Sequence, residues 1–418
     1  MTGEPSQEIL EALQGDATRL FWLDGGGSRD WSRRRSVLGV LGDDDVSLTY
    51  DAARREVVRH QGGNAEVVGD DIFTVLAHHL ADDAEHAPAA QWVGYFGYAA
   101  NPHQPARTAS AGTADGLVPD AVWMRCTDVS VIEEPEHLPD PAPRPRAKAG
   151  PVPDWYAASF AAVQEALHAG HSYEVNLTYR ERLASDVDPV TAYLRLRAAN
   201  PAPYACFLRH PGVALLSSSP ERFAVVRADR VVETKPIKGT TPRGKAPEKD
   251  AAQAHRLATD AKFRAENLMV TDLLRHDVGG ISEIGSVEVP GLMEVESYPH
   301  VHQLVSTIQG RLREEVSTMD ALRALFPAGS MTGAPKRRTM EIIDAVEGSP
   351  RGAYAGAVGW VAADGRADLG VVIRSLVTDG EGTWELGTGG GITVHSQADE
   401  EWAETRWKVA RLRAVLER

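Results

Sequence analysis

The order of apolar and polar positions along the chain predicts many short strands and a small number of helices. Apolar residues at spacings of three and four predict helices over 154–170, 248–277, 318–326, 335–346 and 399–417. Short apolar or alternating runs predict strands at 21–23, 36–41, 91–98, 173–181, 204–208, 213–217, 223–226, 231–233, 355–362, 369–377 and 383–387. Many strands with few helices between them favour an α+β protein with two packed sheets over a βαβ protein.

Proline content divides the chain into two regions. Seven prolines lie between residues 135 and 153, where they prevent regular structure and predict an extended connector. We therefore expect an N-terminal region over 1–134 and a second region over 154–418, folded together as one intertwined unit. The stretch 101–117 is rich in Pro, Ala, Ser, Thr and Gly and is predicted to be a loop.

Composition narrows the class of protein. The 418 residues carry a net charge of −15 without a basic stripe, so we expect no nucleic-acid partner. No apolar run reaches the ~18 residues of a membrane span, and the first residues lack the features of a signal peptide. Cys126 and Cys206 are the only cysteines, too few for a disulfide framework. These features predict a soluble cytoplasmic protein without a membrane partner.

One lysine in a segment rich in Pro and Gly is the first candidate for chemistry. Lys238 lies near the middle of TKPIKGTTPRG (234–244), which we expect to form a rigid turn. An amine attacks carbon only when it is deprotonated, and the pKa of a lysine falls on partial burial or beside other cations. Lys235 and Arg243 are such cations, so we expect them to lower the pKa of Lys238. The alternative is an ordinary solvated cation.

Three charged residues share one face of the last predicted helix. Glu401, Glu404 and Lys408 are spaced by three and four residues. They form either a surface ion pair or a site in which a carboxylate holds a divalent cation and Lys408 holds a substrate carboxylate. Glu266, on the long helix predicted over 248–277, is the matching candidate, because Mg²⁺ commonly takes one or two protein carboxylates.

Further polar residues are candidates for binding an anion or moving a proton. The glycines of TGGG (388–391) follow a predicted strand, and their N–H groups are expected to converge on an anion unless they form only a flexible hairpin. Arg374 lies in a predicted apolar strand, where it requires a carboxylate partner, and Tyr354 is a candidate hydrogen-bond donor. Glu221 lies at a corner between two predicted strands, either as an ordinary turn residue or as a general acid.

Read together, these segments resemble the chorismate-utilising enzymes, which include the anthranilate, aminodeoxychorismate, isochorismate and salicylate synthases. The resemblance covers about 154–416 and includes FPAGSMTGAPK (326–336). It implies an α+β fold similar to anthranilate synthase component I: a sandwich of two large antiparallel sheets flanked by helices, with the active site in a cleft between them.

The resemblance also implies roles for individual residues. Glu266 and Glu404 match the Mg²⁺ ligands, with Glu401 nearby, and Lys238 and Glu221 match the nucleophile and the general acid. The implied substrate-binding residues are Gly239, Thr240, His302, Ser330, Tyr354, Arg374, Gly389, Gly390, Gly391 and Lys408.

Two positions distinguish the branches of this family. The isochorismate and salicylate branch has a lysine where this chain has Glu174, and the anthranilate branch has alanine where this chain has Lys238. The resemblance therefore implies amination of chorismate at C4 through a covalent lysine adduct. It implies that a separate glutamine amidotransferase subunit supplies the ammonia, and that the product leads to 4-aminobenzoate, for folate or for a secondary metabolite.

Two alternatives remain open. One is an anthranilate synthase component I. The other is a non-catalytic regulatory paralogue, motivated by His276, Gly280 and His395, which depart from the family pattern.

Overall fold

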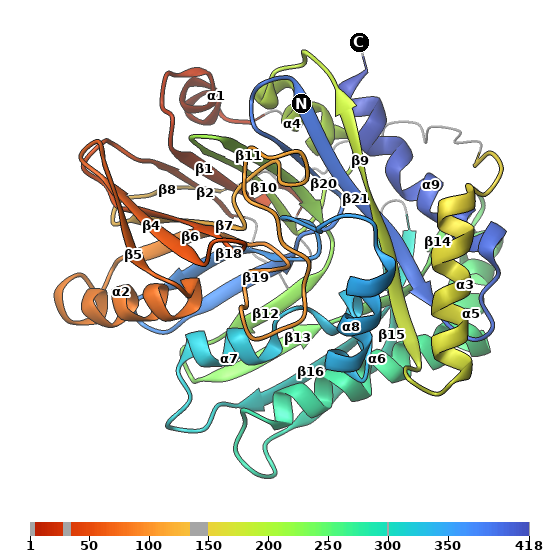
Figure 1. Ribbon diagram of the computed structural model, residues 1–418. Helices are drawn as coiled ribbons and strands as arrows, with labels where there is room; N and C mark the ends of the chain where they lie inside the picture. The colour runs from red at the N-terminus through yellow and green to blue at the C-terminus, as the bar shows by residue number, and fades with distance from the viewer. Residues whose placement is uncertain (1–4, 28–34, 134–148, 299–300, 418) are drawn as a thin grey trace.

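The structure is a computed structural model that describes residues 5–27, 35–133, 149–298 and 301–417. Figure 1 shows two large sheets packed against each other, with helices around them. The expected sandwich of two antiparallel sheets is therefore confirmed. The predicted Pro-rich connector lies mostly outside the described residues.

The first sheet contains nine strands in the described part of the chain. Their spatial order is β17 (Gly333–Ala334), β9 (Glu174–Ala184), β21 (Thr383–Ile392), β20 (Ser375–Thr378), β11 (Val213–Ser219), β10 (Tyr204–His210), β1 (Leu20–Asp24), β2 (Arg35–Val40) and β8 (Ser130–Glu133). Strands from both sides of the connector thus belong to one sheet.

The second sheet contains twelve strands among the described residues. Their order is β14 (Ile237–Pro242), β16 (Val301–Arg311), β13 (Val231–Lys235), β12 (Arg222–Val226), β19 (Ala367–Val371), β18 (Ala357–Ala362), β6 (Gln91–Phe96), β7 (Ala121–Cys126), β3 (Ser47–Asp51), β4 (Glu56–Gln61) and β5 (Asn64–Gly69), and β15 (Glu288–Ser297) pairs with β16. This sheet also combines strands from both sides of the connector.

Helices cover the outer faces and the ends of the sandwich. They are α1 (Gln7–Gln14), α2 (Ile72–His86), α3 (Asp154–His168), α4 (Pro189–Ala199), α5 (Pro247–Thr259), α6 (Ala261–Gly279), α7 (Thr318–Leu325), α8 (Lys336–Val346) and α9 (Ala398–Leu416), with short 3-10 turns at Gly25–Gly27 and Gly329–Met331. None of the helices in the described residues is long and apolar enough to cross a membrane.

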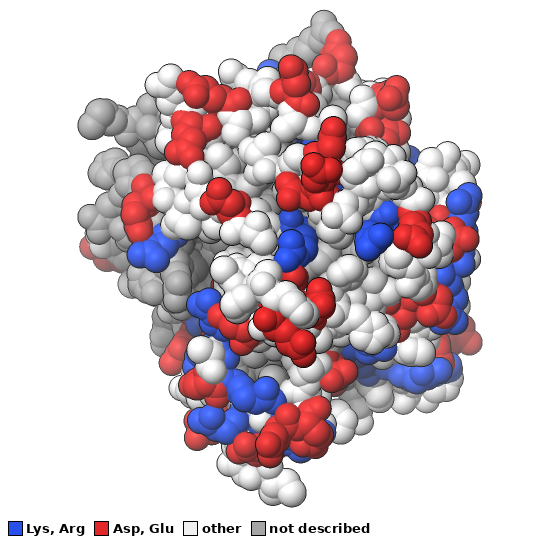
Figure 2. All heavy atoms as spheres, turned by 90° about the vertical axis from the view of Figure 1, so that its left-hand side faces the viewer, with Lys and Arg blue, Asp and Glu red and all other residues white. Residues whose placement is uncertain are grey.

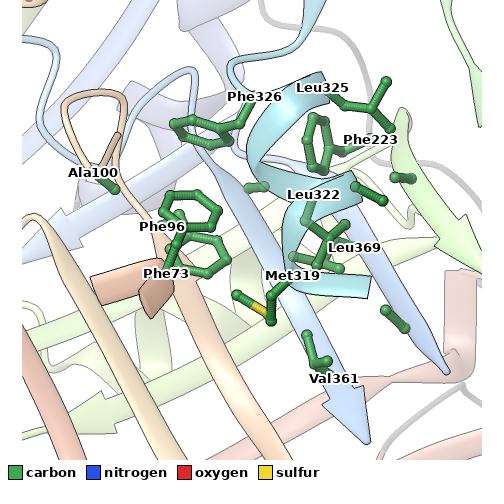
Figure 3. Close-up of a cluster of buried hydrophobic side chains, with 14 of the residues drawn as sticks. Phe73, Phe96, Ala100, Phe223, Met319, Leu322, Leu325, Phe326, Val361 and Leu369 are labelled. Carbon is green, nitrogen blue, oxygen red and sulfur yellow. The ribbon is translucent and has the colours of Figure 1, made fainter. Parts of the chain in front are cut away.

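Alternation along the strands sorts side chains between the layers. On β1, Phe21 packs in the cluster between the two sheets, whereas Leu20 and Trp22 pack on the opposite face with α4 and α9. Figure 3 shows the outer face of the second sheet, where Phe73 of α2 stacks on Phe96 of β6 with ring centres 4.2 Å apart. Met319 and Leu322 of α7 belong to the same cluster.

Surface charge is mixed on the face that carries α2 and the β4–β5 hairpin. Figure 2 shows acidic and basic side chains interspersed there, and the described cations on that face do not form a continuous stripe. This agrees with the acidic net charge of the sequence.

Most predicted elements are present, with ends shifted by a few residues, but two of them are each divided in the structure. The helix predicted over 248–277 is two helices, because Asp260 accepts hydrogen bonds from the N–H groups of Lys262 and Phe263 and so caps a new helix. The strand predicted over 369–377 is interrupted after Val371, and Arg374 has a left-handed φ of 51° before β20 begins. Arg374 therefore lies between strands rather than within one.

The glycine-rich segment and the lysine segment were also predicted incorrectly. Strand β21 continues through Gly391, which pairs with Asn176 of β9, so successive N–H groups point in opposite directions and cannot form an anion-binding nest. Lys238 lies on strand β14 rather than in a turn, at a bulge in the pairing of β14 with β16. Gly239 has a φ of +91° at that bulge.

Candidate active site

A cavity of about 460 Å³ lies between strands of both sheets and helices α6 and α9. This volume is in the range of small-ligand sites. Nearly all of the predicted site residues line it: Glu221, Lys238, Gly239, Thr240, Glu266, Ser330, Tyr354, Arg374, Gly389, Gly390, Gly391, Glu401, Glu404 and Lys408. Residues more than 180 positions apart in the sequence are thus brought to one cavity.

His302 is the predicted site residue that does not line this cavity. Its side chain is buried, with Nδ1 2.8 Å from Ser297 Oγ and Nε2 3.0 Å from Asp250 Oδ1. The next residue, Gln303, lines the cavity instead. Because side chains alternate along β16, the two neighbours point to opposite faces of the strand.

Lys238 contacts a carboxylate rather than another cation. Its Nζ forms an ion pair with Glu174 Oε1, and the side chains of Lys238 and Glu174 are 12% and 2% exposed. Burial lowers the pKa of Lys238, but Glu174, Glu266 and Glu221 outweigh it and raise that pKa above its usual value. The predicted lowering is therefore wrong for the free protein.

The two cations expected to lower this pKa are engaged elsewhere. Lys235 Nζ lies 2.8 Å from Glu296 Oε1, and Arg243 Nη2 lies 2.6 Å from Asp250 Oδ2. Neither residue lines the cavity. Lys235 and Lys238 lie on β13 and β14, which follow one another along β16, and side-chain alternation directs the two lysines toward different surroundings.

Glu221 is placed where it can keep a proton near neutral pH. It lies in the link between β11 and β12, where the chain passes from the first sheet to the second, and its side chain is buried. Burial raises the pKa of Glu221 to about 7, although the cations Lys238 and Arg374 act in the opposite direction. A carboxyl group with this pKa can serve as a general acid.

Carboxylates from two helices face the same cavity. Burial raises the pKa of Glu266 to about 7, and the nearby carboxylates of Glu174 and Glu401 add to the rise. Burial also raises the pKa of Glu401, which accepts a hydrogen bond of 2.7 Å from Ser396. Lys408, whose Nζ is 2.8 Å from Glu404 Oε1, lowers the pKa of Glu404.

This donor set fits a hard divalent cation. Repulsion between these carboxylates adds to the effect of burial on the pKa values of Glu266 and Glu401, and a cation between the helices would relieve that repulsion. In the described residues the carboxylates are not already gathered into a group of three metal ligands. The carboxylate of Glu401 lies 3.7 Å from Lys262 Nζ, a lining residue one helical turn before Glu266 that the sequence analysis missed.

The glycines of β21 form a wall without side chains. A Cβ at Gly391 would overlap the carboxylate of Glu174 and stand 3.0 Å from Lys238 Nζ, and a Cβ at Gly390 would stand 3.2 Å from Glu401 Oε2. The carbonyl of Gly389 accepts a hydrogen bond of 2.8 Å from Lys408. These glycines leave space for the charged groups instead of binding an anion through consecutive N–H groups.

Behind Tyr354 lies a buried charge cluster that the sequence analysis did not predict. The Arg180 guanidinium lies 5.0 Å from the centre of the Tyr354 ring. Arg180 and Arg351 each donate to Glu347, at 3.0 and 2.7 Å. Two arginines with one glutamate place excess positive charge beside a cavity-lining phenol, which favours an anionic ligand there.

The fold and this cavity define a chorismate binding enzyme, and the model of that family matches residues 40–414. The chain belongs to this family. It is 39% identical to the aminodeoxychorismate synthase of Streptomyces pristinaespiralis over 97% of this chain and 63% of the relative. It is 46% identical to aminodeoxychorismate synthase component 1 of Escherichia coli (strain K12) over 63% of this chain and 58% of the relative.

The chain thus spans less than two thirds of the length of these two relatives. Among solved structures, anthranilate synthase component I from Streptococcus pneumoniae TIGR4 is similar with a TM-score of 0.75 and 25% identity, covering 93% of this chain and 94% of that chain.

Proposed function

We propose that this protein aminates chorismate at C4 with ammonia to give 4-amino-4-deoxychorismate, the reaction of an aminodeoxychorismate synthase component I. The observation that carries the proposal is the position of Lys238, whose amine lines the same cavity as the buried acid Glu221. An amine and a protonated carboxyl group in one cavity suit substitution of a ring hydroxyl through a covalent adduct.

The proposed chemistry has two steps. Glu221 donates its proton to the C4 hydroxyl, which leaves as water, while the Lys238 amine forms a bond to C2 and the ring double bonds shift. Ammonia then bonds to C4, the double bonds shift back, and the bond between C2 and Lys238 breaks. The ammonium group formed at C4 returns a proton to Glu221.

The two carboxylates of chorismate require cations and hydrogen-bond donors. Arg374 and Lys408 are the proposed cationic partners, and Tyr354 is the proposed phenolic donor. Burial raises the pKa of Tyr354 to about 12, so the phenol keeps its proton. Gly239, Thr240 and Ser330 complete the lining near Lys238.

Glu266 and Glu404, with Glu401 nearby, would hold Mg²⁺. The cation would offset the charge of the ring carboxylate when bound. The residues of the chain then orient the ring between Lys238 and Glu221.

A separate glutamine amidotransferase subunit is the proposed source of ammonia. Burial raises the pKa of Cys126 to about 11 and that of Cys206 to about 12, so neither thiol suits the nucleophile of a glutaminase. The Escherichia coli relative is named a component 1, which supports a two-component system. The product would supply 4-aminobenzoate, and we propose a cytoplasmic location.

Incubation with chorismate, Mg²⁺ and ammonium chloride tests the function. We expect 4-amino-4-deoxychorismate, identified by chromatography and by conversion to 4-aminobenzoate with a lyase. The similarity to anthranilate synthase component I favours anthranilate as the rival product, and anthranilate as the main product would overturn the proposal. Absence of any turnover would instead support a regulatory paralogue.

A further inference from the structure

The amine of Lys238 must lose a proton before it can attack carbon, and this step requires a proton acceptor within reach of the amine. In the free protein this amine is charged, because the carboxylates around it raise its pKa. An ammonium group has no lone pair, so a base in contact with Nζ is a requirement of the covalent step.

Glu174 is the carboxylate in contact with that amine. Its Oε1 forms the ion pair with Lys238, and its side chain is 2% exposed. Its Oε2 is buried and accepts no hydrogen bond from the described residues. Among the described residues, Lys238 is therefore the donor that forms a side-chain hydrogen bond with this buried carboxylate.

The position of Glu174 is fixed by the fold. Its backbone pairs with Ala334 of β17, and the adjacent Val175 pairs with Ile392 of β21. Ser172 Oγ donates a hydrogen bond of 2.8 Å to the Glu174 carbonyl. Gly391 supplies the space for the carboxylate, because any side chain there would overlap it. Strands β9, β17 and β21 thus hold Glu174 in place against Lys238 of β14.

We propose that Glu174 is a catalytic residue that accepts a proton from Lys238 before the amine attacks and returns it when the amine leaves. This inference rests on the proposed function. In a buried site the exchange of an ion pair for a neutral pair is easier than in water, because burial disfavours both charged forms.

The proton and electron balance closes over the cycle. The charged amine passes one proton to Glu174, and its freed lone pair forms the bond to C2 while the C4–oxygen bond breaks. When ammonia has bonded to C4, the C2–nitrogen bond breaks and its electron pair returns to the Lys238 nitrogen. That nitrogen then takes back the proton held by Glu174. Glu221 donates a proton to the leaving hydroxyl and accepts one from the ammonium group formed at C4. Glu174 and Glu221 therefore transfer different protons.

The alternative is that Glu174 only holds Lys238 in place. Replacement by glutamine separates the two roles, because the amide keeps the shape and a hydrogen-bond acceptor but cannot take the proton. A holding group that keeps the amine charged would slow the attack, so its loss would leave adduct formation unchanged or faster.

The test measures adduct formation on the peptide that contains Lys238, by mass spectrometry, after mixing with chorismate and Mg²⁺ without ammonia. We expect Glu174→Gln to slow adduct formation about 100-fold, as for loss of a general base. Chorismate affinity, measured by calorimetry, should stay within about threefold, since the predicted carboxylate-binding groups are untouched. Glu174→Asp, which retains a base, should form the adduct at least tenfold faster than Glu174→Gln.

Glu296→Gln is the matched control. Glu296 of β15 forms an ion pair with Lys235 of β13 in the same sheet as Lys238, outside the cavity, at 2.8 Å. Its adduct rate should equal that of the wild-type protein. A wild-type rate in Glu174→Gln, or equal rates in the Asp and Gln variants, would overturn the inference. If the wild-type protein makes no 4-amino product from ammonium, the proposed function fails; if it does and the Glu174 variants behave like wild type, only this inference fails.

Discussion

Gly387 lies against the ring of Tyr354 so closely that any Cβ at position 387 would overlap the ring. Because position 387 of β21 has no side chain, the Tyr354 ring packs directly against the strand at the cavity wall. Arg180 lies on the ring as well, 5.0 Å from its centre. The position of Tyr354 is set by these contacts before any substrate arrives.

Gly387→Ala should displace Tyr354 and weaken chorismate binding. Overlap in a packed site costs about 1–3 kcal/mol, so we expect a rise in KM of about tenfold and a lower melting temperature. Steady-state kinetics and thermal unfolding measure both effects. Gly348→Ala is the control, because position 348 has open space for a Cβ and should change neither value. An unchanged KM in Gly387→Ala would refute the role of this contact.

Lys238→Ala should abolish formation of the 4-amino product while chorismate still binds. The variant removes the proposed nucleophile but leaves Arg374, Lys408 and the carboxylates in place, so kcat should fall by about 1000-fold or more. Mass spectrometry should detect the adduct peptide in the wild-type protein and not in the variant. Full activity of the variant would reduce Lys238 to a positioning cation and reject the covalent mechanism.

Glu404→Gln should weaken Mg²⁺ binding. We expect the Mg²⁺ concentration for half-maximal activity to rise at least tenfold, because one of the proposed carboxylate ligands loses its charge. Calorimetric titration with Mg²⁺ alone provides a readout that is independent of turnover. Glu400→Gln is the matched control, because Glu400 is an exposed glutamate one helical turn before Glu404 that does not line the cavity. Equal Mg²⁺ affinities in the two variants would contradict this assignment.

Asp120 predicts a pH dependence of stability. Burial raises its pKa to about 7, and its Oδ2 accepts the Ala52 N–H at 2.8 Å. Because the folded pKa lies above the unfolded value of 3.8, the folded state is penalised increasingly as pH rises from about 4 to 7. The penalty is then constant at higher pH.

Asp120→Asn keeps a hydrogen-bond acceptor but has no charge to bury. Its free energy of unfolding should exceed that of the wild-type protein by at most about 4 kcal/mol above pH 7, and the difference should shrink toward pH 4. Denaturant unfolding at a series of pH values measures it. The exposed Asp16→Asn serves as the control. A difference that does not change with pH would show that Asp120 is not the titrating group.

Periodicity and motif content predicted the two-sheet architecture and most of the cavity lining, because they reflect local preferences and a family pattern. These patterns did not predict how far individual strands extend. Gly391 extends β21 because β9 offers a partner along its whole length, and that pairing is formed by residues more than 200 positions away. A run of glycines has no intrinsic preference that would reveal it.

The charged groups around Lys238 were also not predicted from the sequence. The sequence places Lys235 and Arg243 beside Lys238, but the pleat turns them to Glu296 and Asp250, and brings Glu174 to the amine from another sheet. His302 was assigned from its motif, whereas strand alternation directs Gln303 to the cavity. The helix N-cap at Asp260 could have been predicted from the sequence, because Asp is a preferred N-cap residue.

The cavity joins the two layers of the sandwich. Lys238 comes from the second sheet and Gly389 from the first, while Glu221 and Arg374 lie where the chain crosses from one to the other. A molecule held by all of these groups would fasten the sheets together at this end of the protein. Ligand binding is therefore expected to stabilise the contact between the two sheets. Amide hydrogen exchange in β14 and in β21 should slow together when chorismate binds.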